Sequence, residues 1–212
     1  MKKLNDIRYD IDTLLLRSKF PKDNGIIGKA LAIYELKNIP ASHVLAEVLV
    51  AHYIKSKGFT DVDIEHTVAG TKCDVYARAR RIDICIEIEF PFVPPKHIID
   101  SYEYLLAKHV KKIAQIARSG IMYASFAYPR GVIPLVPIDF LRPPASRIRK
   151  RLLELISITR KFFPIDEAEE EALWYANIYG ILIFDLSSAR IYELTTQTVE
   201  ILITLYDSFL TE

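Results

Sequence analysis

The residues at 82–90 alternate strictly between apolar and polar side chains, and this alternation constrains the fold more than any other part of the chain. The even-numbered positions are isoleucine or phenylalanine, and the odd-numbered positions are Asp83, Cys85, Glu87 and Glu89. A period of two is typical of a β-strand with one buried face. Because glutamate is depleted in strands, two glutamates on one face indicate either a solvent-facing surface or a functional role.

The preceding segment, residues 72–78, predicts the partner strand. In an antiparallel hairpin that turns at residues 80–81, Asp74 lies opposite Glu87. Like charges at ~5 Å are destabilising, so we expect this pair to bind a cation or to share a proton. Two arginines fit a two-residue turn poorly, which favours a four-residue loop over 79–82. The other facing pairs are favourable: Val75 with Ile86, Ala77 with Ile84, Ala79 with Ile82, Arg78 with Asp83, and Lys72 with Glu89.

The size of the chain predicts one domain that occupies residues 1–212. No apolar run reaches the ~18 residues of a membrane span, and the first residues lack a signal-peptide core. We therefore expect an intracellular, cytoplasmic protein without a membrane partner. In the hairpin register Cys73 and Cys85 lie on opposite faces, which argues against a disulfide and agrees with a reducing compartment.

Charge is distributed unevenly although the net charge is only +1. Residues 96–161 hold 13 lysines and arginines against 4 acidic residues. Residues 162–212 hold 1 basic residue against 10 acidic ones. A basic middle segment in a nearly neutral protein indicates a local face that binds a polyanion. The acidic end is expected to pack the core, to form a dimer contact or to screen that face.

Hydrophobic periodicity and capping residues predict helices and strands along the whole chain. Helices are expected over 5–17, from 23–25 onward, over 40–57, 96–119, 146–161 and 166–175, and from Thr195 or Thr196 onward. Strands are expected over 61–68, 72–79, 82–90, 121–128, 178–186 and 189–194. His43 and Glu47 share a helix face with apolar residues, which places Glu47 at the edge of a core-facing surface. The lysines of the helix over 96–119 are expected to face outward, and Ile98 and Ile99 inward.

The segments AEVLVAHYIKSKGF, GTKCDVY and ICIEIEF resemble the PD-(D/E)XK nuclease superfamily, and within it most closely the archaeal Holliday-junction resolvases. The resemblance covers about residues 42–128. It implies an α/β fold with a restriction-endonuclease-like core, ordered helix, three strands, helix, strand, and a central mixed sheet flanked by helices. Residues 1–39 are then an N-terminal helical addition, residues 40–128 the nuclease core, and residues 129–212 an extension with a basic helix and an acidic α/β end. An archaeal virus or its host is the implied source.

The resemblance also implies a metal site. Glu47 matches the helix acid, Asp74 and Glu87 match the two strand acids, and the carbonyl of Ile88 is a further ligand for Mg²⁺ or Mn²⁺. Glu89 occupies the position of the family's catalytic lysine. Lys72, or else Lys96 or Lys108, is expected to replace that lysine, or Glu89 recruits a second metal ion, or activity is lost.

The activity implied is metal-dependent hydrolysis of DNA phosphodiesters, structure-specific for branched DNA such as Holliday junctions, in replication, repair or recombination. Resolvases of this type act as homodimers. The alternative is a catalytically lapsed DNA-binding or assembly protein on a nuclease scaffold. The residues expected to contact DNA are His43, Lys108, Lys111, Lys112, Arg147, Arg149, Lys150 and Arg151.

Overall fold

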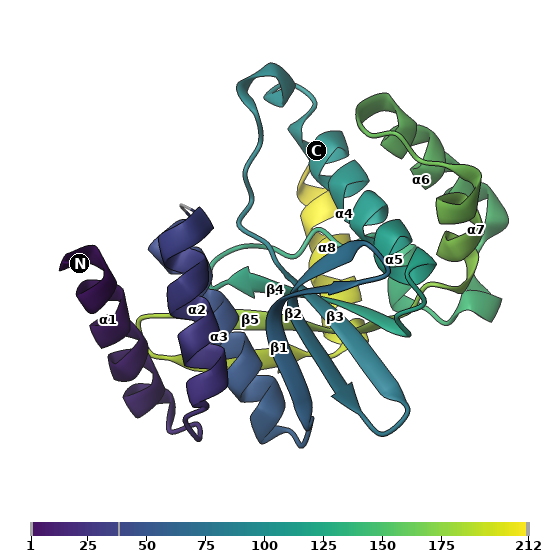
Figure 1. Cartoon of the computed structure of the whole chain (residues 1–212). Coiled ribbons are helices and arrows are strands. Elements are labelled where there is room, and N and C mark those ends of the chain that lie inside the picture. The colour runs from purple at the N-terminus through teal and green to yellow at the C-terminus, as the bar shows by residue number, and fades with distance from the viewer. Residues whose placement is uncertain (1, 38, 211–212) are drawn as a thin grey trace.

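The alternating segment forms a strand within a six-stranded sheet in a computed structural model that describes residues 2–37 and 39–210. The strands follow one another across the sheet in chain order, β1 to β6. Three helices, α1 to α3, cover one face, and α4 with the later helices covers the other (Figure 1). The predicted α/β fold, with a central mixed sheet flanked by helices, is confirmed.

The three predicted N-terminal helices form, although the first begins three residues earlier than predicted. They are α1 (Lys2–Ser18), α2 (Asn24–Lys37) and α3 (Ala41–Ser56). A carboxylate oxygen of Asp23 accepts hydrogen bonds from the amides of Gly25 and Ile26, which satisfies donors at the start of α2. Gly58 follows α3 with φ +94°, a conformation that glycine adopts readily. Side chains from α1, α2 and α3 form one hydrophobic core with the sheet.

The predicted order of helix, three strands, helix, strand is confirmed from α3 onward. The strands β1 (Asp61–Val68), β2 (Thr71–Ala79) and β3 (Ile82–Ile88) pair antiparallel. The chain then passes through η1 (Pro95–His97) and α4 (Ser101–Arg118) to β4 (Tyr123–Pro129), which pairs parallel with β3. This crossover places α4 on the face of the sheet opposite α3.

The C-terminal segment adds two strands to the same sheet. After α5 (Ile138–Leu141), η2 (Pro144–Ser146), α6 (Arg149–Phe162) and α7 (Glu167–Tyr175), the predicted hairpin forms as β5 (Ile178–Asp185) and β6 (Arg190–Leu194). β5 pairs parallel with β4. The last helix, α8 (Thr196–Leu210), is capped by Thr195, whose hydroxyl accepts from the amide of Thr198. Among the described residues, no helix is both long and apolar enough to cross a membrane.

The hairpin register is confirmed over most of its length, but its turn differs from the prediction. Val75 pairs with Ile86 and Ala79 pairs with Ile82, so the connection is the two-residue turn Arg80–Arg81 rather than a four-residue loop. Arg80 adopts φ +55°, the left-handed conformation that such a turn requires. The pairing of the flanking strands therefore outweighs the unfavourable turn residues.

The register fails at Asp74, next to the candidate site. Pairing between β2 and β3 ends at Val75 and Ile86, and Asp74 accepts a hydrogen bond from the amide of Ile88 instead of facing Glu87. Cys73, the residue before Asp74, packs with Cys85 in the hydrophobic core on the face of the sheet that α4 covers. These two cysteines form a disulfide with Cα atoms 5.4 Å apart. The predictions that they lie on opposite faces and remain unbonded are wrong, because the pairing of β2 with β3 ends at Val75 and Ile86 while β2 continues alongside β1.

The predicted start of the helix over residues 96–119 is also wrong, because α4 begins at Ser101. Residues 91–100 hold only the short turn η1 and project from the body of the molecule (Figure 1). Ile98 and Ile99, predicted to face the core, are 66% and 103% exposed. Pro94 and Pro95 begin only the short turn η1, and the regular helix starts at Ser101 after Asp100.

Removing the disulfide is expected to destabilise the protein by about 3 kcal/mol, because a closed loop of this length restricts the unfolded chain. The change is Cys73→Ala with Cys85→Ala, and the measurement is urea denaturation with and without a reducing agent. Wild-type protein under reducing conditions should resemble the double variant. If denatured wild-type protein titrates with two free thiols before any reductant is added, the bond is absent and the prediction is wrong.

Candidate functional site

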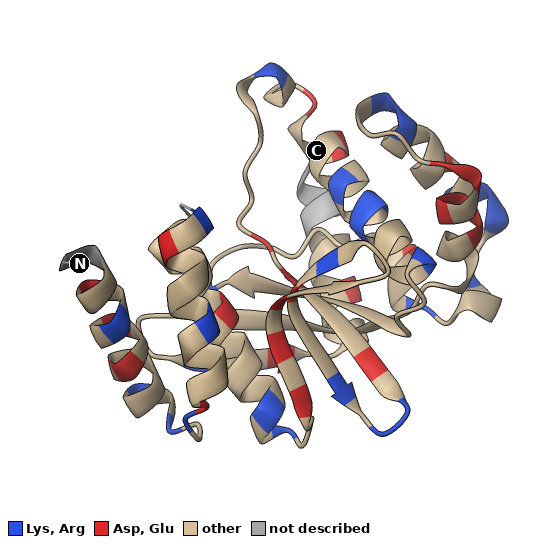
Figure 2. Ribbon diagram, in the orientation of Figure 1, with Lys and Arg blue, Asp and Glu red and all other residues tan. Residues whose placement is uncertain are grey.

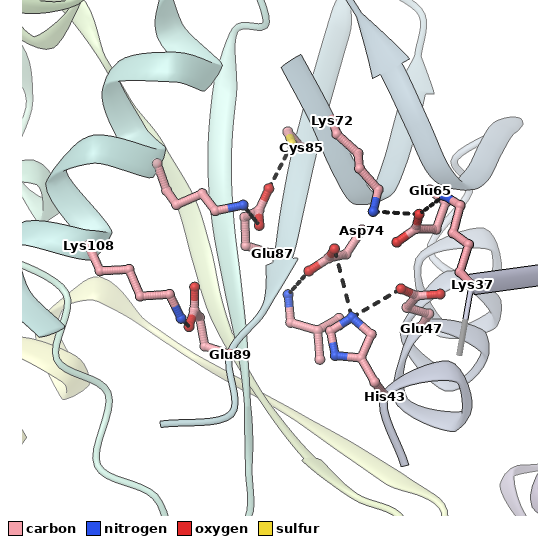
Figure 3. Close-up of polar contacts among 12 residues, drawn as sticks. Lys37, His43, Glu47, Glu65, Lys72, Asp74, Cys85, Glu87, Glu89 and Lys108 are labelled. Carbon is pink, nitrogen blue, oxygen red and sulfur yellow. Dashed lines mark hydrogen bonds and ion pairs between the residues drawn. The ribbon is translucent and has the colours of Figure 1, made fainter. Parts of the chain in front are cut away.

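Four carboxylates from three elements approach one another where α3 crosses β2 and β3 (Figure 3). They belong to Glu47 on α3, Asp74 on β2, and Glu87 and Glu89 in and after β3. Glu47 is fully buried, and Glu87 and Glu89 are 2% and 3% exposed. Several buried carboxylates so close together need hydrogen-bonding or oppositely charged partners. Their partners differ, and they divide the four acids into separate groups.

The first group contains His43, Glu47 and Asp74. Nε2 of His43 lies 3.1 Å from Oε1 of Glu47 and 3.8 Å from Oδ1 of Asp74. Burial lowers the pKa of His43, but the nearby carboxylates of Asp74 and Glu47 outweigh it and raise that pKa to about 10. Burial raises the pKa of Glu47 to about 7 despite its contact with His43. A hydrogen bond from the Ile88 amide, 2.8 Å long, orients Asp74.

Asp74 remains ionised in this group. Burial favours its neutral form, but the neighbouring His43 and the hydrogen bond from the amide of Ile88 outweigh burial and hold the pKa of Asp74 below its ordinary value. The contact that Ile88 makes with the site is through its N–H group, whereas the prediction assigned it a carbonyl ligand. Asp74 therefore offers a negative charge at neutral pH whose direction is set by the backbone of β3.

Glu87 pairs with a lysine from the opposite side of the sheet. Nζ of Lys112 on α4 lies 2.6 Å from Oε2 of Glu87. Burial and the charge of Asp74 outweigh the opposing effect of Lys112 and together raise the pKa of Glu87 to about 7. A pocket of about 230 Å³ opens onto this pair, and its wall includes Lys72 and Thr71. The site is thus accessible from the side of α4 and the β1–β2 turn.

Glu89, at the position of the family lysine, makes an ion pair of its own. Nζ of Lys108 lies 2.5 Å from Oε2 of Glu89. Lys72 does not lie opposite Glu89 as predicted; it pairs at 2.5 Å with Glu65, which also binds Lys37. Two of the candidate replacement lysines, Lys72 and Lys108, therefore have other carboxylate partners, and Lys112 is the lysine that contacts Glu87.

The predicted convergence of Glu47, Asp74 and Glu87 holds only in part. Ligand atoms of His43, Glu47 and Asp74 all lie within 4.8 Å of one another, and Glu87 is not a member of this group. The charge of Asp74 still raises the pKa of Glu87, so the two carboxylates remain in one electrostatic environment. The sequence spacing places the acids in one region but does not separate the His43 group from the Lys112 pair.

Most of the residues predicted to bind DNA have internal partners. Lys111 pairs with Glu169 at 2.6 Å, as Lys108 and Lys112 pair with Glu89 and Glu87. These lysines were expected to face solvent and are only partly exposed. The acidic α7 lies beside α4 and α6, so bases and acids alternate over this surface (Figure 2). The acidic C-terminal segment therefore neutralises part of the basic surface.

Arg147 is a structural residue rather than a DNA contact. Its guanidinium donates to the backbone carbonyls of Asp139, Arg142, Leu173, Trp174 and Ala176. It also lies over the ring of Phe140. A planar group with five donors suits such a cluster of carbonyls. Arg147 thereby joins the loop before α6 to the end of α7, and its prediction as a DNA contact is not supported by its position.

Three of the predicted DNA contacts remain at the surface at the start of α6. Arg149 and Lys150 are exposed, and Arg151 lies 3.5 Å from Asp139. Lys150 is 86% exposed and 4.0 Å from Glu154, and exposed pairs of this kind contribute little to stability. These three side chains form the basic surface of α6, the part of the predicted polyanion face that stays available.

Two features of the site escaped the sequence analysis. Glu65 adopts φ +48° within β1, and its carboxylate pairs with Lys37 and Lys72. No local pattern distinguishes Glu65 from the other acids of its strand. The pairing of His43 with Glu47 was detectable, because residues four apart on a helix are neighbours.

Comparisons with known proteins add only weak structural likeness. No protein-family model matches the sequence, and no curated protein matches it. Among solved structures, the chain is similar to SfsA from Pyrococcus furiosus in complex with Ca²⁺, with a TM-score of 0.31 and 14% sequence identity. The match covers 73% of this chain and 61% of that one. A likeness of this size carries no argument about activity.

Proposed function

We propose that the protein is a metal-dependent nuclease that hydrolyses DNA phosphodiesters, with structure-specific cleavage of branched DNA such as Holliday junctions. The observation that carries the proposal is the Glu87–Lys112 pair at the wall of a pocket beside Asp74. Acidic ligands next to a lysine are what phosphodiester hydrolysis needs, because the reaction places extra negative charge on the phosphate oxygens.

The metal ion would be Mg²⁺ or Mn²⁺, held by Asp74 and Glu47, with Glu87 as the neighbouring carboxylate that pairs with Lys112. The residues fit such an ion, because both carboxylate oxygens of Glu47 are buried without a hydrogen-bond partner in the described part of the chain. When bound, a divalent cation lowers the pKa of a water molecule and stabilises charge on the phosphate. Ile88 keeps Asp74 oriented toward this position through its amide.

Lys112 would take the role of the missing strand lysine. Its ammonium reaches Glu87 from α4 and lines the pocket. Burial lowers its pKa, but Glu87 outweighs burial and raises that pKa, so Lys112 stays charged. A fixed positive charge there stabilises the anionic transition state without belonging to β3.

DNA would reach the site along the basic surface of α6, formed by Arg149, Lys150 and Arg151. Phosphate contacts of this kind position a nucleic acid without reading its sequence. A homodimer would supply two sites that cut two of the four strands of a fourfold junction, and replication, repair or recombination are the processes that create such DNA. An intracellular location follows from this substrate.

The second candidate is a DNA-binding or assembly protein whose catalytic function has been lost. It is favoured by the ion pairs themselves, since Glu87 and Glu89 each contact a lysine and His43 contacts the remaining two acids. A site neutralised by its own side chains has less need of a divalent cation.

Cleavage assays separate the two candidates. Labelled four-way junctions, duplexes and single strands are incubated with Mn²⁺, with Mg²⁺ or with EDTA, using wild type, Lys112→Met and the surface control Lys22→Met. We expect metal-dependent cleavage that Lys112→Met reduces roughly 100-fold without a loss of DNA affinity, and no effect of the control. Binding without metal-dependent cleavage of any substrate would favour the second candidate.

A further inference from the structure

The side chains of His43, Glu47 and Asp74 form a ligand group that includes a nitrogen atom. Within residues 2–37 and 39–210, it is the one group of three or more His, Cys, Asp or Glu residues whose ligand atoms all lie within 4.8 Å. His43 is close to both acids, at 3.1 Å from Glu47 and 3.8 Å from Asp74. The predicted metal site contained only oxygen ligands, so His43 changes its chemistry.

Glu47 supplies independent evidence for a bound cation. Its side chain is fully buried at the edge of the group, and neither carboxylate oxygen has a hydrogen-bond partner among the described residues. The ion pair with His43 is close but does not have hydrogen-bond geometry. A buried polar group without a hydrogen bond destabilises the folded state. Coordination of a cation would satisfy both oxygens.

The backbone positions all three side chains. His43 and Glu47 are four residues apart on α3, which places them on one face of the helix. The amide of Ile88 holds Oδ2 of Asp74 and leaves Oδ1 toward His43. Hydrogen bonds to ligand side chains commonly fix their orientation in this way. Two rigid elements, α3 and the β2–β3 pair, thus define the group.

The spacing of the atoms suits a small divalent ion. Metal–nitrogen and metal–oxygen bonds of about 2.0–2.2 Å place neighbouring ligands roughly 3–4 Å apart at tetrahedral or octahedral angles. The measured separations of 3.1 Å and 3.8 Å from Nε2 of His43 match this spacing. Water or a substrate oxygen would complete the coordination.

We propose that His43, Glu47 and Asp74 bind a transition-metal ion of the Mn²⁺ to Zn²⁺ series in preference to Mg²⁺, with Nε2 of His43 as a direct ligand. An imidazole suits these ions, whereas Mg²⁺ prefers oxygen ligands. The metal site is proposed independently of the nuclease activity, and only the role of the ion in DNA cleavage rests on the proposed function. His43 is then a metal ligand and not a contact for DNA phosphate.

Metal binding without DNA tests the proposal. Metal-free protein is titrated with Co²⁺, Mn²⁺ and Mg²⁺ by calorimetry, and the Mn²⁺ complex is examined by pulsed EPR for coupling to imidazole nitrogen. The variants are His43→Gln and the matched control His66→Gln, because His66 also pairs with an aspartate, Asp63, at 2.8 Å. Thermal melting verifies that both variants fold.

We expect wild type to bind Co²⁺ and Mn²⁺ more tightly than Mg²⁺ and to show nitrogen coupling. His43→Gln should weaken Co²⁺ binding at least roughly 10–100-fold and remove the coupling, while His66→Gln should change neither. Equal affinity for Mg²⁺ and Co²⁺, or coupling that survives in His43→Gln, would overturn the proposal. Metal binding with these properties but no DNA cleavage would leave it standing and reject only the nuclease activity.

Discussion

Asp74→Asn is expected to reduce metal-dependent DNA cleavage by roughly 10²–10³-fold while leaving the fold intact. The asparagine side chain keeps an oxygen that can accept the hydrogen bond from Ile88, so the junction of β2 and β3 is retained. The asparagine side chain lacks the negative charge of Asp74. Asp74 needs this charge both to attract the metal ion and to orient His43. The measurement is the single-turnover cleavage rate of a labelled junction in saturating Mn²⁺.

The matched control is Asp61→Asn, an exposed aspartate at the start of β1. It should cleave at the wild-type rate. Circular dichroism should show that both variants have wild-type secondary structure. A folded Asp74→Asn protein that cleaves as fast as wild type would remove Asp74 from the mechanism, and with it the proposed site.

Glu47→Gln is expected to flatten the pH dependence of stability of the metal-free protein. The pKa of Glu47 is raised from 4.5 to about 7 in the folded state, mainly by burial. The folded protein therefore keeps a proton that the unfolded chain releases, and stability is lost as the pH rises from about 4.5 through about 7. The raised pKa corresponds to a loss of about 3 kcal/mol, and glutamine has no charge to bury.

Urea denaturation at pH 5 and pH 8 in the presence of EDTA measures this effect. Wild type should lose about 3 kcal/mol more than Glu47→Gln between the two pH values, while Glu87, whose pKa is also raised to about 7, contributes equally to both proteins. Glu35→Gln, at an exposed position on α2, serves as the control and should behave as wild type. An identical pH dependence in wild type and Glu47→Gln would show that burial does not raise the pKa of Glu47.

The same substitution should abolish metal binding, because glutamine is a much weaker ligand than a carboxylate. Greater stability together with lost binding is the pattern expected of a residue retained for function at a cost in stability. That pattern would connect the missing hydrogen bonds of Glu47 directly to the cation site.

Much of the fold could be predicted from local patterns. The alternation over residues 82–90 identified β3, and the apolar pairs of the hairpin set its register with β2 as far as Val75 and Ile86. Caps such as Asp23 and Gly58 marked helix ends correctly. These signals are reliable because each depends on neighbours along the chain or directly across one hairpin.

The sequence by itself determined which acids lie near one another, because strand alternation and helix spacing bring Glu47, Asp74 and Glu87 to one region. Only the tertiary structure decided their partners. Lys112 reaches Glu87 from α4, and Cys73 turns toward Cys85 where the regular ladder ends. Such contacts join elements that no local period relates, and buried charges select whichever opposite charge packing brings within reach. For that reason the lysines of α4, predicted to face solvent, form ion pairs with Glu89, Glu169 and Glu87.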